Sequence, residues 1–213
     1  MLFMNRQEAG QQLAKALKHY SNHPNAIVFG LPRGGLPVAY EVAKELGLPL
    51  DVYIVRKLGA PYNPEFAIGA IASHGAEVLN DEAMRLLSID PQTLAQIVKQ
   101  EKQELARREL LYRANKPIPD IKDKVVIIID DGLATGSTMR AAIAAIRQFS
   151  PESIVVAVPV APVDEIQNIH READEVVCLH TPSHFHSVGA WYHDFSQTTD
   201  EEVKSLLRLD PRI

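Results

Sequence analysis

Short runs of β-branched and aliphatic residues alternate with longer amphipathic stretches along most of the chain. Five such runs predict buried strands, at residues 26–29, 50–55, 125–129, 154–158 and 175–179. The stretches between them carry apolar residues at helical spacing, as in 37–46, which Gly47 closes. Strands that alternate with helices form a parallel sheet with helices on both of its faces. We therefore predict an α/β fold with an open, mainly parallel, twisted sheet.

The pattern changes between about residues 58 and 115. A stretch rich in Gly and Pro at 58–65 predicts a loop, and short strands at 66–71 and 77–79 are spaced as a hairpin. A long helix then runs from Pro91 to about Tyr112 and ends in a break at 115–119. We predict one domain, 1–213, with a flexible loop and helical insertion at about 58–115. Further helices are expected at 5–20 and from Asp200 onward.

Composition narrows the class of protein. The 213 residues are 46% hydrophobic, enough for a sizeable core, and the net charge of −5 disfavours nucleic acid as the main partner. The single cysteine, Cys178, excludes an internal disulfide. The sequence shows no apolar signal region and no long apolar span. We therefore expect a soluble cytoplasmic protein without a membrane partner.

Two adjacent acids, Asp130 and Asp131, follow the strand at 125–129, and a loop of small and hydroxyl residues follows them. If a helix begins at Thr138, the loop lies at its N-terminus, where free amides bind phosphate. Carboxylates accept hydrogen bonds from sugar hydroxyls or from waters on a divalent cation. One ligand that carries both a phosphate and a diol would bind to the loop and to the acid pair at the same time. The plainer alternative is a crossover in which the acids only cap the helix.

The segment 125–138 closely resembles the signature of type I phosphoribosyltransferases, which bind 5-phosphoribosyl diphosphate (PRPP). The resemblance implies that Asp130 and Asp131 contact the ribose hydroxyls and, through PRPP and water, a Mg²⁺ ion. It further implies that the loop wraps the 5′-phosphate with Ala134, Thr135, Gly136, Ser137 and Thr138. Hypoxanthine-guanine enzymes of this family usually carry Asp where this chain has Ala134, so an Asp-assisted mechanism is not expected here.

A second loop, Arg33-Gly34-Gly35, follows the strand at 26–29. Glycines let the backbone approach an anion, and an arginine grips it as a fork. Leu36 stands where a P-loop needs Lys, and no dinucleotide fingerprint is present. The segment resembles the family's diphosphate loop, in which the peptide bond entering the basic residue, here from Pro32, is commonly cis. A plain tight turn is the alternative.

Arg56 and Lys57 close the predicted strand at 50–55 and precede the breaker-rich loop. They resemble the basic pair that family members place near the diphosphate, before a mobile loop that covers the reacting centre. A surface charge pair is the alternative.

Aromatic residues gather near the C-terminus, where the resemblance implies a small hood over the base at about 180–200. Val188 would supply backbone groups to the base edge, and Trp191 or Phe185 would stack on the base. The alternative is that these aromatics fill a subsidiary core. The nearby residues Cys178, His180, His184 and His186 match no standard structural zinc spacing.

The resemblance implies a Mg²⁺-dependent phosphoribosyltransferase. Such an enzyme would transfer the phosphoribosyl group from PRPP to a nitrogenous base, expected to be a nucleobase in nucleotide salvage, with release of diphosphate. The catalytic residues would be Arg33, Arg56, Lys57, Asp130 and Asp131, and PRPP would also contact Gly34 and Gly35. The rival hypothesis is a non-catalytic regulator that senses PRPP or a nucleotide. The sequence leaves open the acceptor base and whether the chain forms a homodimer.

Overall fold

A computed structural model describes residues 3–113 and 116–209 and confirms the α/β fold. Its main sheet has five parallel strands in the order β2-β1-β6-β7-β8. These strands are β1 (Ala26–Gly30), β2 (Leu50–Val52), β6 (Val125–Ile129), β7 (Ser153–Val160) and β8 (Glu175–His180). Gly30 pairs with Ile129, so the segments that leave β1 and β6 emerge side by side at the carboxyl edge of the sheet.

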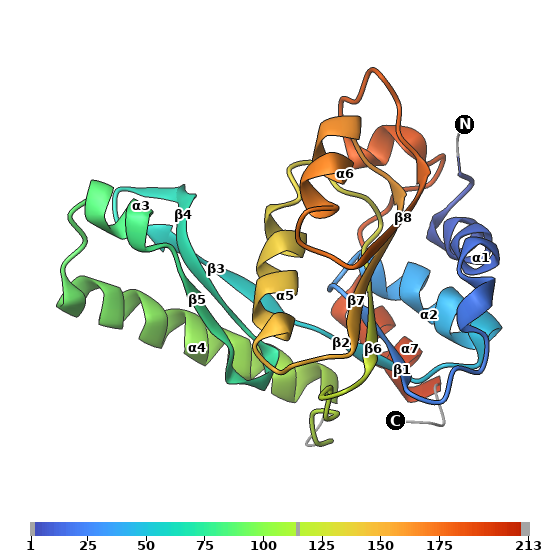
Figure 1. Ribbon diagram of the computed structural model, residues 1–213, viewed down its shortest axis with the longest axis horizontal. Helices are drawn as coiled ribbons and strands as arrows, with labels where there is room; N and C mark the ends of the chain where they lie inside the picture. Colours follow the sequence, from blue (N-terminus) through green and yellow to red (C-terminus); the bar gives the residue numbers. More distant parts are fainter. Residues whose placement is uncertain (1–2, 114–115, 210–213) are drawn as a thin grey trace.

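Helices cover both faces of this sheet (Figure 1). One layer consists of α1 (Arg6–Ala16) and α2 (Gly35–Leu46), and the other of α5 (Ser137–Arg147) and α6 (Val163–Ile169). Alternate residues of a strand point to opposite faces, so Ile127 and Ile129 pack towards α2, while Val126 and Ile128 pack towards α5. Both faces of β6 are buried, which explains its unbroken β-branched run.

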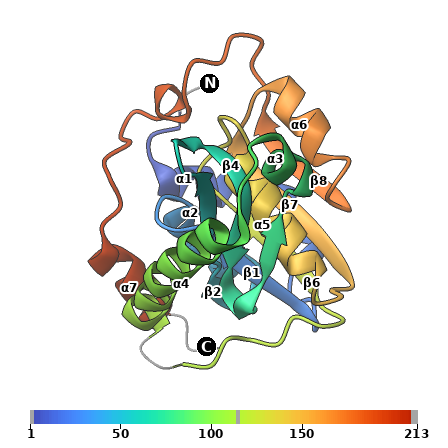
Figure 2. The same ribbon diagram turned by 90° about the vertical axis from the view of Figure 1, so that its left-hand side faces the viewer.

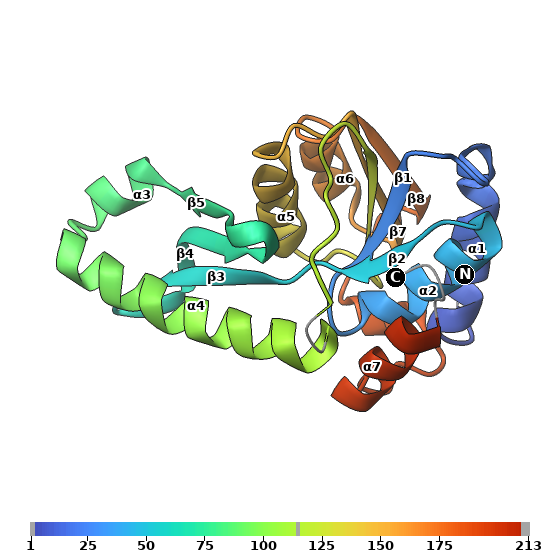
Figure 3. The ribbon, with the colours of Figure 1, turned by 90° about the horizontal axis from the view of Figure 1, so that it is seen from below.

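A second, antiparallel sheet forms a projecting arm beside the main sheet (Figures 1 and 2). We define the arm as residues 55–113, which form β3 (Val55–Ala60), β4 (Asn63–Ala72), β5 (Glu77–Leu79), α3 (Asp81–Leu86) and α4 (Pro91–Arg113). Seen from below, α4 runs along the arm and ends close to α7 (Asp200–Leu209) of the main body (Figure 3).

The arm corrects two expectations. The strand predicted at 50–55 ends at Val52, because Val55 already belongs to the second sheet. The segment predicted as a loop, 58–65, is the tip of the β3–β4 hairpin. Residues 61 and 62 form the turn, and the residues on either side of them belong to the paired strands. The hairpin between 66–71 and 77–79 is confirmed. The long helix is also confirmed and ends at Arg113; the first residue of the predicted break, Asn115, lies outside the described residues.

The helix ends differ in detail from the predictions. Asn5 caps α1 by accepting a hydrogen bond from the Glu8 amide, and the predicted helix at 5–20 finishes in a 3₁₀ turn, Lys18–Tyr20. Gly47 closes α2 in the left-handed conformation, as predicted. Two more 3₁₀ turns lie at Ser73–Gly75 and Val188–Trp191. Within the described part of the chain, no helix combines the length and apolar character needed to span a membrane.

Candidate functional site

The glycine loop after β1 and the acid pair after β6 are in direct contact. A Cβ atom added to Gly34 would overlap Oδ2 of Asp131, and one added to Gly35 would lie 2.7 Å from the carbonyl oxygen of Ile129. No side chain fits at either position without displacing these atoms. The peptide bond between Pro32 and Arg33 is cis, as the resemblance implies. Two motifs almost one hundred residues apart therefore form one surface at the sheet edge.

The two acids of this surface are partly buried and close together. Oδ1 of Asp130 accepts a hydrogen bond from the amide of Asp131 at 2.9 Å. Burial raises the pKa of both carboxyl groups, and the neighbouring charge of Asp131 raises the pKa of Asp130 further. An arginine, Arg6, acts in the opposite direction and lowers the pKa of Asp131. The site therefore places two adjacent carboxyl groups, one of them paired with Arg6, where water is partly excluded.

Arg6 is the residue that sequence reasoning missed. Its Nε and Nη2 atoms lie 2.9 and 2.8 Å from Oδ2 of Asp131, and the two side chains are only 12% and 13% exposed. Arg6 is the first residue of α1, one position after the Asn5 cap. No local signal distinguishes it from a solvent-exposed arginine, because its partner is 125 residues away.

The small-residue loop lies beside the acids and leads into α5. This helix begins at Ser137, one residue before the predicted start, and Gly136 precedes it in the left-handed conformation with φ of 62°. The side chains of Ala134, Thr135 and Thr138 are exposed. The loop therefore presents an open helix N-terminus to any ligand beside the acid pair.

A cavity of about 590 Å³ adjoins this loop. Ala134 and Thr135 line one part of it, Asp164 of α6 lines another, and Phe185 and His186 line a third. The cavity thus brings Phe185 of the hood, which we define as residues 180–200, to the predicted phosphate loop. A larger groove of about 690 Å³ lies along α4 in the arm and includes none of the predicted site residues.

The other predicted base-binding residues lie elsewhere in the hood. Val188 and Trp191 pack against the small cluster of Phe3, Ala9 and Tyr192. The subsidiary core weighed as an alternative is therefore present, and it contains Trp191 but not Phe185. Among the predicted aromatic partners of a base, only Phe185 borders the cavity.

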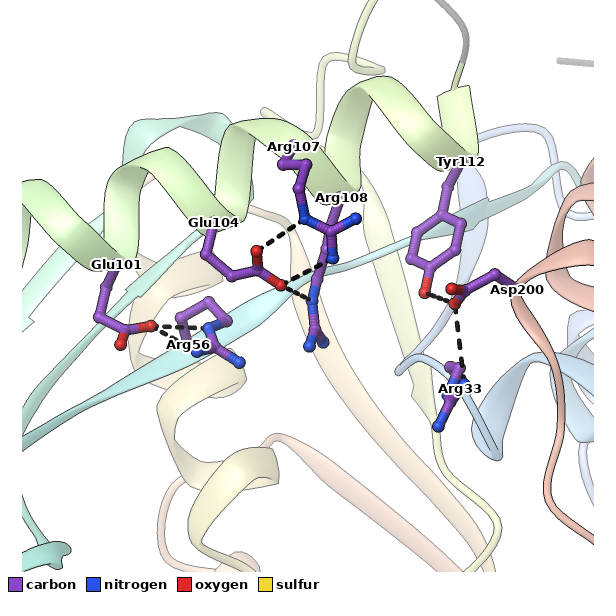
Figure 4. Close-up of polar contacts among 8 residues, drawn as sticks. All are labelled: Arg33, Arg56, Glu101, Glu104, Arg107, Arg108, Tyr112 and Asp200. Atoms are coloured by element: carbon purple, nitrogen blue, oxygen red, sulfur yellow. Dashed lines mark hydrogen bonds and ion pairs between the residues drawn. The ribbon is translucent and has the colours of Figure 1, made fainter.

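Arg33, in the glycine loop, is partly exposed and faces α7 (Figure 4). Its Nη1 atom lies 3.9 Å from Oδ1 of Asp200, which also accepts a hydrogen bond of 2.6 Å from the hydroxyl of Tyr112. Burial and this hydrogen bond raise the pKa of Tyr112 to about 12. The glycine loop is thereby connected to the end of α4.

The placement expected for Arg56 and Lys57 is wrong. Both lie within β3 of the second sheet and not at the end of a main-sheet strand. Consecutive strand residues point to opposite faces, so the two cations do not face one cleft together. Arg56 pairs with Glu101 of α4 at 2.6 Å (Figure 4), and Lys57 is exposed. Their assignment to PRPP remains a prediction.

The histidines near Cys178 do not form a metal site with it. The described residues contain no group of three or more His, Cys, Asp or Glu side chains placed to hold a metal ion. The thiol of Cys178 instead donates to the carbonyl oxygen of His180 at 3.2 Å, and burial raises its pKa to about 11.

The fold and the signature together define a type I phosphoribosyltransferase architecture. The chain belongs to the phosphoribosyl transferase domain family, whose profile matches residues 4–196. A protein of Mycobacterium tuberculosis H37Rv, provisionally named a phosphoribosyl transferase, is 44% identical over 206 residues; the match covers 97% of this chain and 46% of that protein. The chain thus spans about half the length of this curated relative. The crystal structure of TT1426 from Thermus thermophilus is 42% identical, with a TM-score of 0.86, and the match covers 97% of this chain and 98% of that one.

Proposed function

We propose that this chain transfers the 5-phosphoribosyl group from PRPP to a nitrogenous base and releases diphosphate. The observation that carries the proposal is the contact between Gly34 and Asp131. PRPP carries its diphosphate on the carbon next to its diol, so a diphosphate loop and diol-binding acids must adjoin. The loop at 134–138, three residues beyond the acids, then suits the 5′-phosphate.

Departure of diphosphate leaves positive charge on the ribose ring, as in other glycosyl transfers. The amide of Gly34 and the guanidinium of Arg33 would stabilise the leaving group, whereas the amide of Gly35 already donates to the carbonyl of Leu31 at 3.0 Å. Asp130 and Asp131 would hold the diol beside the cationic carbon. With Ala134 in the loop, the chain offers no carboxylate there to remove a proton from the base. Orientation and charge stabilisation would therefore provide most of the acceleration.

Magnesium fits this donor set. Carboxylate oxygens of Asp130 and Asp131, with hydroxyl and diphosphate oxygens of PRPP, are the hard ligands that Mg²⁺ prefers, mostly through water. The metal would supply charge neutralisation of the departing diphosphate. Since Asp131 is already paired with Arg6, Asp130 is the stronger candidate for this contact.

We assign the acceptor to the cavity beside the phosphate loop. Phe185 offers an aromatic face there, and Asp164 and His186 offer hydrogen-bonding groups, a combination that suits a flat heterocycle such as a nucleobase. Nucleotide salvage in the cytoplasm is the corresponding role, and the lone cysteine agrees with a reducing compartment.

The regulator hypothesis receives less support. A regulator that acts on nucleic acid would need free basic residues. The adjacent arginines of α4, Arg107 and Arg108, both pair with Glu104 at 2.8 Å (Figure 4). These pairs hold the pKa of Glu104 at about 2, so its charge persists at any physiological pH.

The test is a binding and turnover assay. Labelled PRPP, Mg²⁺ and a panel of bases should give a nucleotide product, and PRPP with Mg²⁺ should raise the melting temperature of the protein. Replacing both acids, Asp130→Asn with Asp131→Asn, should abolish that rise. Asp81→Asn, at the exposed start of α3 in the arm, should retain it. An unchanged rise in the double variant would remove the diol assignment, and PRPP binding without product would favour the regulator.

A further inference from the structure

The N-terminal segment holds the hood against the main body. The amide of Phe3 donates to the carbonyl of Trp191 at 2.8 Å, and the amide of His193 donates back to the carbonyl of Phe3 at 2.8 Å. The amide of Asp194 donates to the carbonyl of Met4 at 2.9 Å. These bonds anchor one part of the hood, and they lead directly into Arg6.

Arg6 contacts three parts of the candidate site at once. Besides its two bonds to Asp131, its Nη1 donates to the carbonyl of Ser196 at 2.7 Å, and its guanidinium lies 3.9 Å from the centre of the Phe195 ring. A Cβ on Gly34 would lie 3.3 Å from its Nη2. The fork of Arg6 therefore bridges the acid pair and the hood, and it borders the glycine loop.

We propose that Arg6 is a positioning residue that locks the hood to Asp131, so that the hood and the acid pair move as one unit. The planar guanidinium can donate to a carboxylate from one side and to a carbonyl from another while a ring packs on its face. A lysine has one point charge and does not hold all three partners. Tyr192 adds a parallel connection, because its hydroxyl donates to the backbone carbonyl of Asp131 at 2.6 Å.

The two acids, Asp130 and Asp131, have different roles in this arrangement. Oδ2 of Asp131 already accepts two bonds from Arg6, whereas the side chain of Asp130 accepts the neighbouring amide. Asp131 therefore orients the site, and Asp130 makes the larger contribution to the sugar. That division rests on the proposed function; the locking of the hood does not.

Trp191, the only tryptophan of the chain, reports on the hood directly. Arg6→Gln should raise the acrylamide quenching of its fluorescence about twofold, because the hood opens more often. Asp131→Asn should give a similar rise, and the double variant should give no more than either single variant. Arg6→Lys should lie between Arg6→Gln and the wild type, which keeps the test valid if Arg6→Gln fails to fold.

Arg147→Gln is the matched control, since Arg147 also pairs with an aspartate, Asp174, at 2.8 Å but lies outside the hood. Quenching in this variant should match the wild type. Unchanged quenching in folded Arg6→Gln and Arg6→Lys, or additive rises in the double variant, would overturn the proposal.

A titration with PRPP and Mg²⁺ separates this inference from the proposed function. If the wild type binds PRPP, Arg6→Gln should weaken binding about tenfold through misplacement of the acids, and Arg6→Lys should restore part of it. If the wild type does not bind PRPP, the proposed function fails, while the quenching of Trp191 still decides whether Arg6 locks the hood.

Discussion

At the residue scale, the close contacts of Gly34 explain why the two loops can meet. Gly34 has helical backbone angles that any residue adopts, so its small size, and not its conformational freedom, is what the site requires. The atom that a side chain would meet is Oδ2 of Asp131, which Arg6 holds in place. Displacing that oxygen would disturb its two bonds to Arg6.

Gly34→Ala should therefore destabilise the protein by about 2–3 kcal/mol through overpacking and should impair PRPP binding. The measurement is thermal unfolding with and without PRPP and Mg²⁺. Gly75→Ala is the control, because a Cβ there meets nothing within 4 Å while φ is +76°. It should cost about 1 kcal/mol from backbone strain and leave binding unchanged. Equal effects of the two substitutions would show that the contact with Asp131 does not matter.

Asp130 gives a prediction about pH. Because its folded pKa is raised above the usual 3.8, the native state binds the proton more tightly than the unfolded state. The free energy of unfolding therefore decreases as pH rises from about 4 through the raised pKa, and stays lower above it. Asp130→Asn should stabilise the free protein by about 1 kcal/mol at pH 7 and lose this advantage towards pH 4.

Thermal unfolding from pH 4 to pH 8 measures the effect, with exposed Asp164→Asn as control. The stabilised Asp130→Asn protein should nevertheless bind PRPP poorly, so lost binding would not reflect misfolding. A lower melting temperature than that of the wild type at pH 7 would contradict the prediction.

At the scale of elements, α4 supports the arm through its contact with β3. Arg56 and Glu101 form an ion pair at 2.6 Å with exposures of 29% and 19%, while Glu104 pairs with Arg107 and Arg108 of its own helix. The pair between Arg56 and Glu101 joins β3 to α4, whereas the pairs of Glu104 stabilise α4 itself. The charged face of α4 therefore has two distinct structural roles.

Glu101→Gln should lower the free energy of unfolding by about 1 kcal/mol and increase amide hydrogen exchange in β3 and β4. Glu104→Gln is the matched control. It should cost about 0.5 kcal/mol and increase exchange only within α4. Equal exchange in β3 for the two variants would mean that the ion pair with Arg56 does not hold the arm.

At the scale of the whole molecule, the arm meets the main body where α4 ends beside α7. The hydroxyl of Tyr112 bonds to Asp200, which also faces Arg33 of the glycine loop (Figure 4). A change in the position of the arm would thus reach the predicted diphosphate site through one carboxylate.

Tyr112→Phe should cost about 1 kcal/mol, because Asp200 loses a short hydrogen bond. Since the pKa of Tyr112 is raised to about 12, this residue adds to the loss of stability of the wild type as pH rises above 10. The variant should lose less stability over this range, and the remaining loss comes from Tyr20, Tyr53 and Tyr192, whose pKa values burial also raises. Thermal unfolding measures both effects on stability. Titration with inorganic diphosphate tests the connection to the glycine loop, and the affinity of Tyr112→Phe should differ from that of the wild type. Fully exposed Tyr62→Phe is the control and should change neither. Diphosphate affinity unaltered by Tyr112→Phe would separate the arm from the site.

Much of the main sheet could be predicted from sequence because its information is local. The unbroken run in β6 requires burial on both faces, and the acids and small residues that follow it are contiguous. The arm was harder. Arg56 and Lys57 continue an apolar run, and nothing in that run shows that the chain changes sheet after Val52. Which strand a residue joins depends on hydrogen-bonding partners far along the chain.

By itself, the sequence determined the α/β class, the succession of the main strands along the chain and the family to which the chain belongs, since each depends on periodicity or on contiguous motifs. The tertiary structure decided that Gly34 abuts Asp131, that Arg6 joins the acid pair to the hood, and that Phe185 rather than Trp191 borders the cavity. These facts concern residues distant in sequence. Their contacts arise only when the sheet brings the ends of its strands together, so no local pattern encodes them.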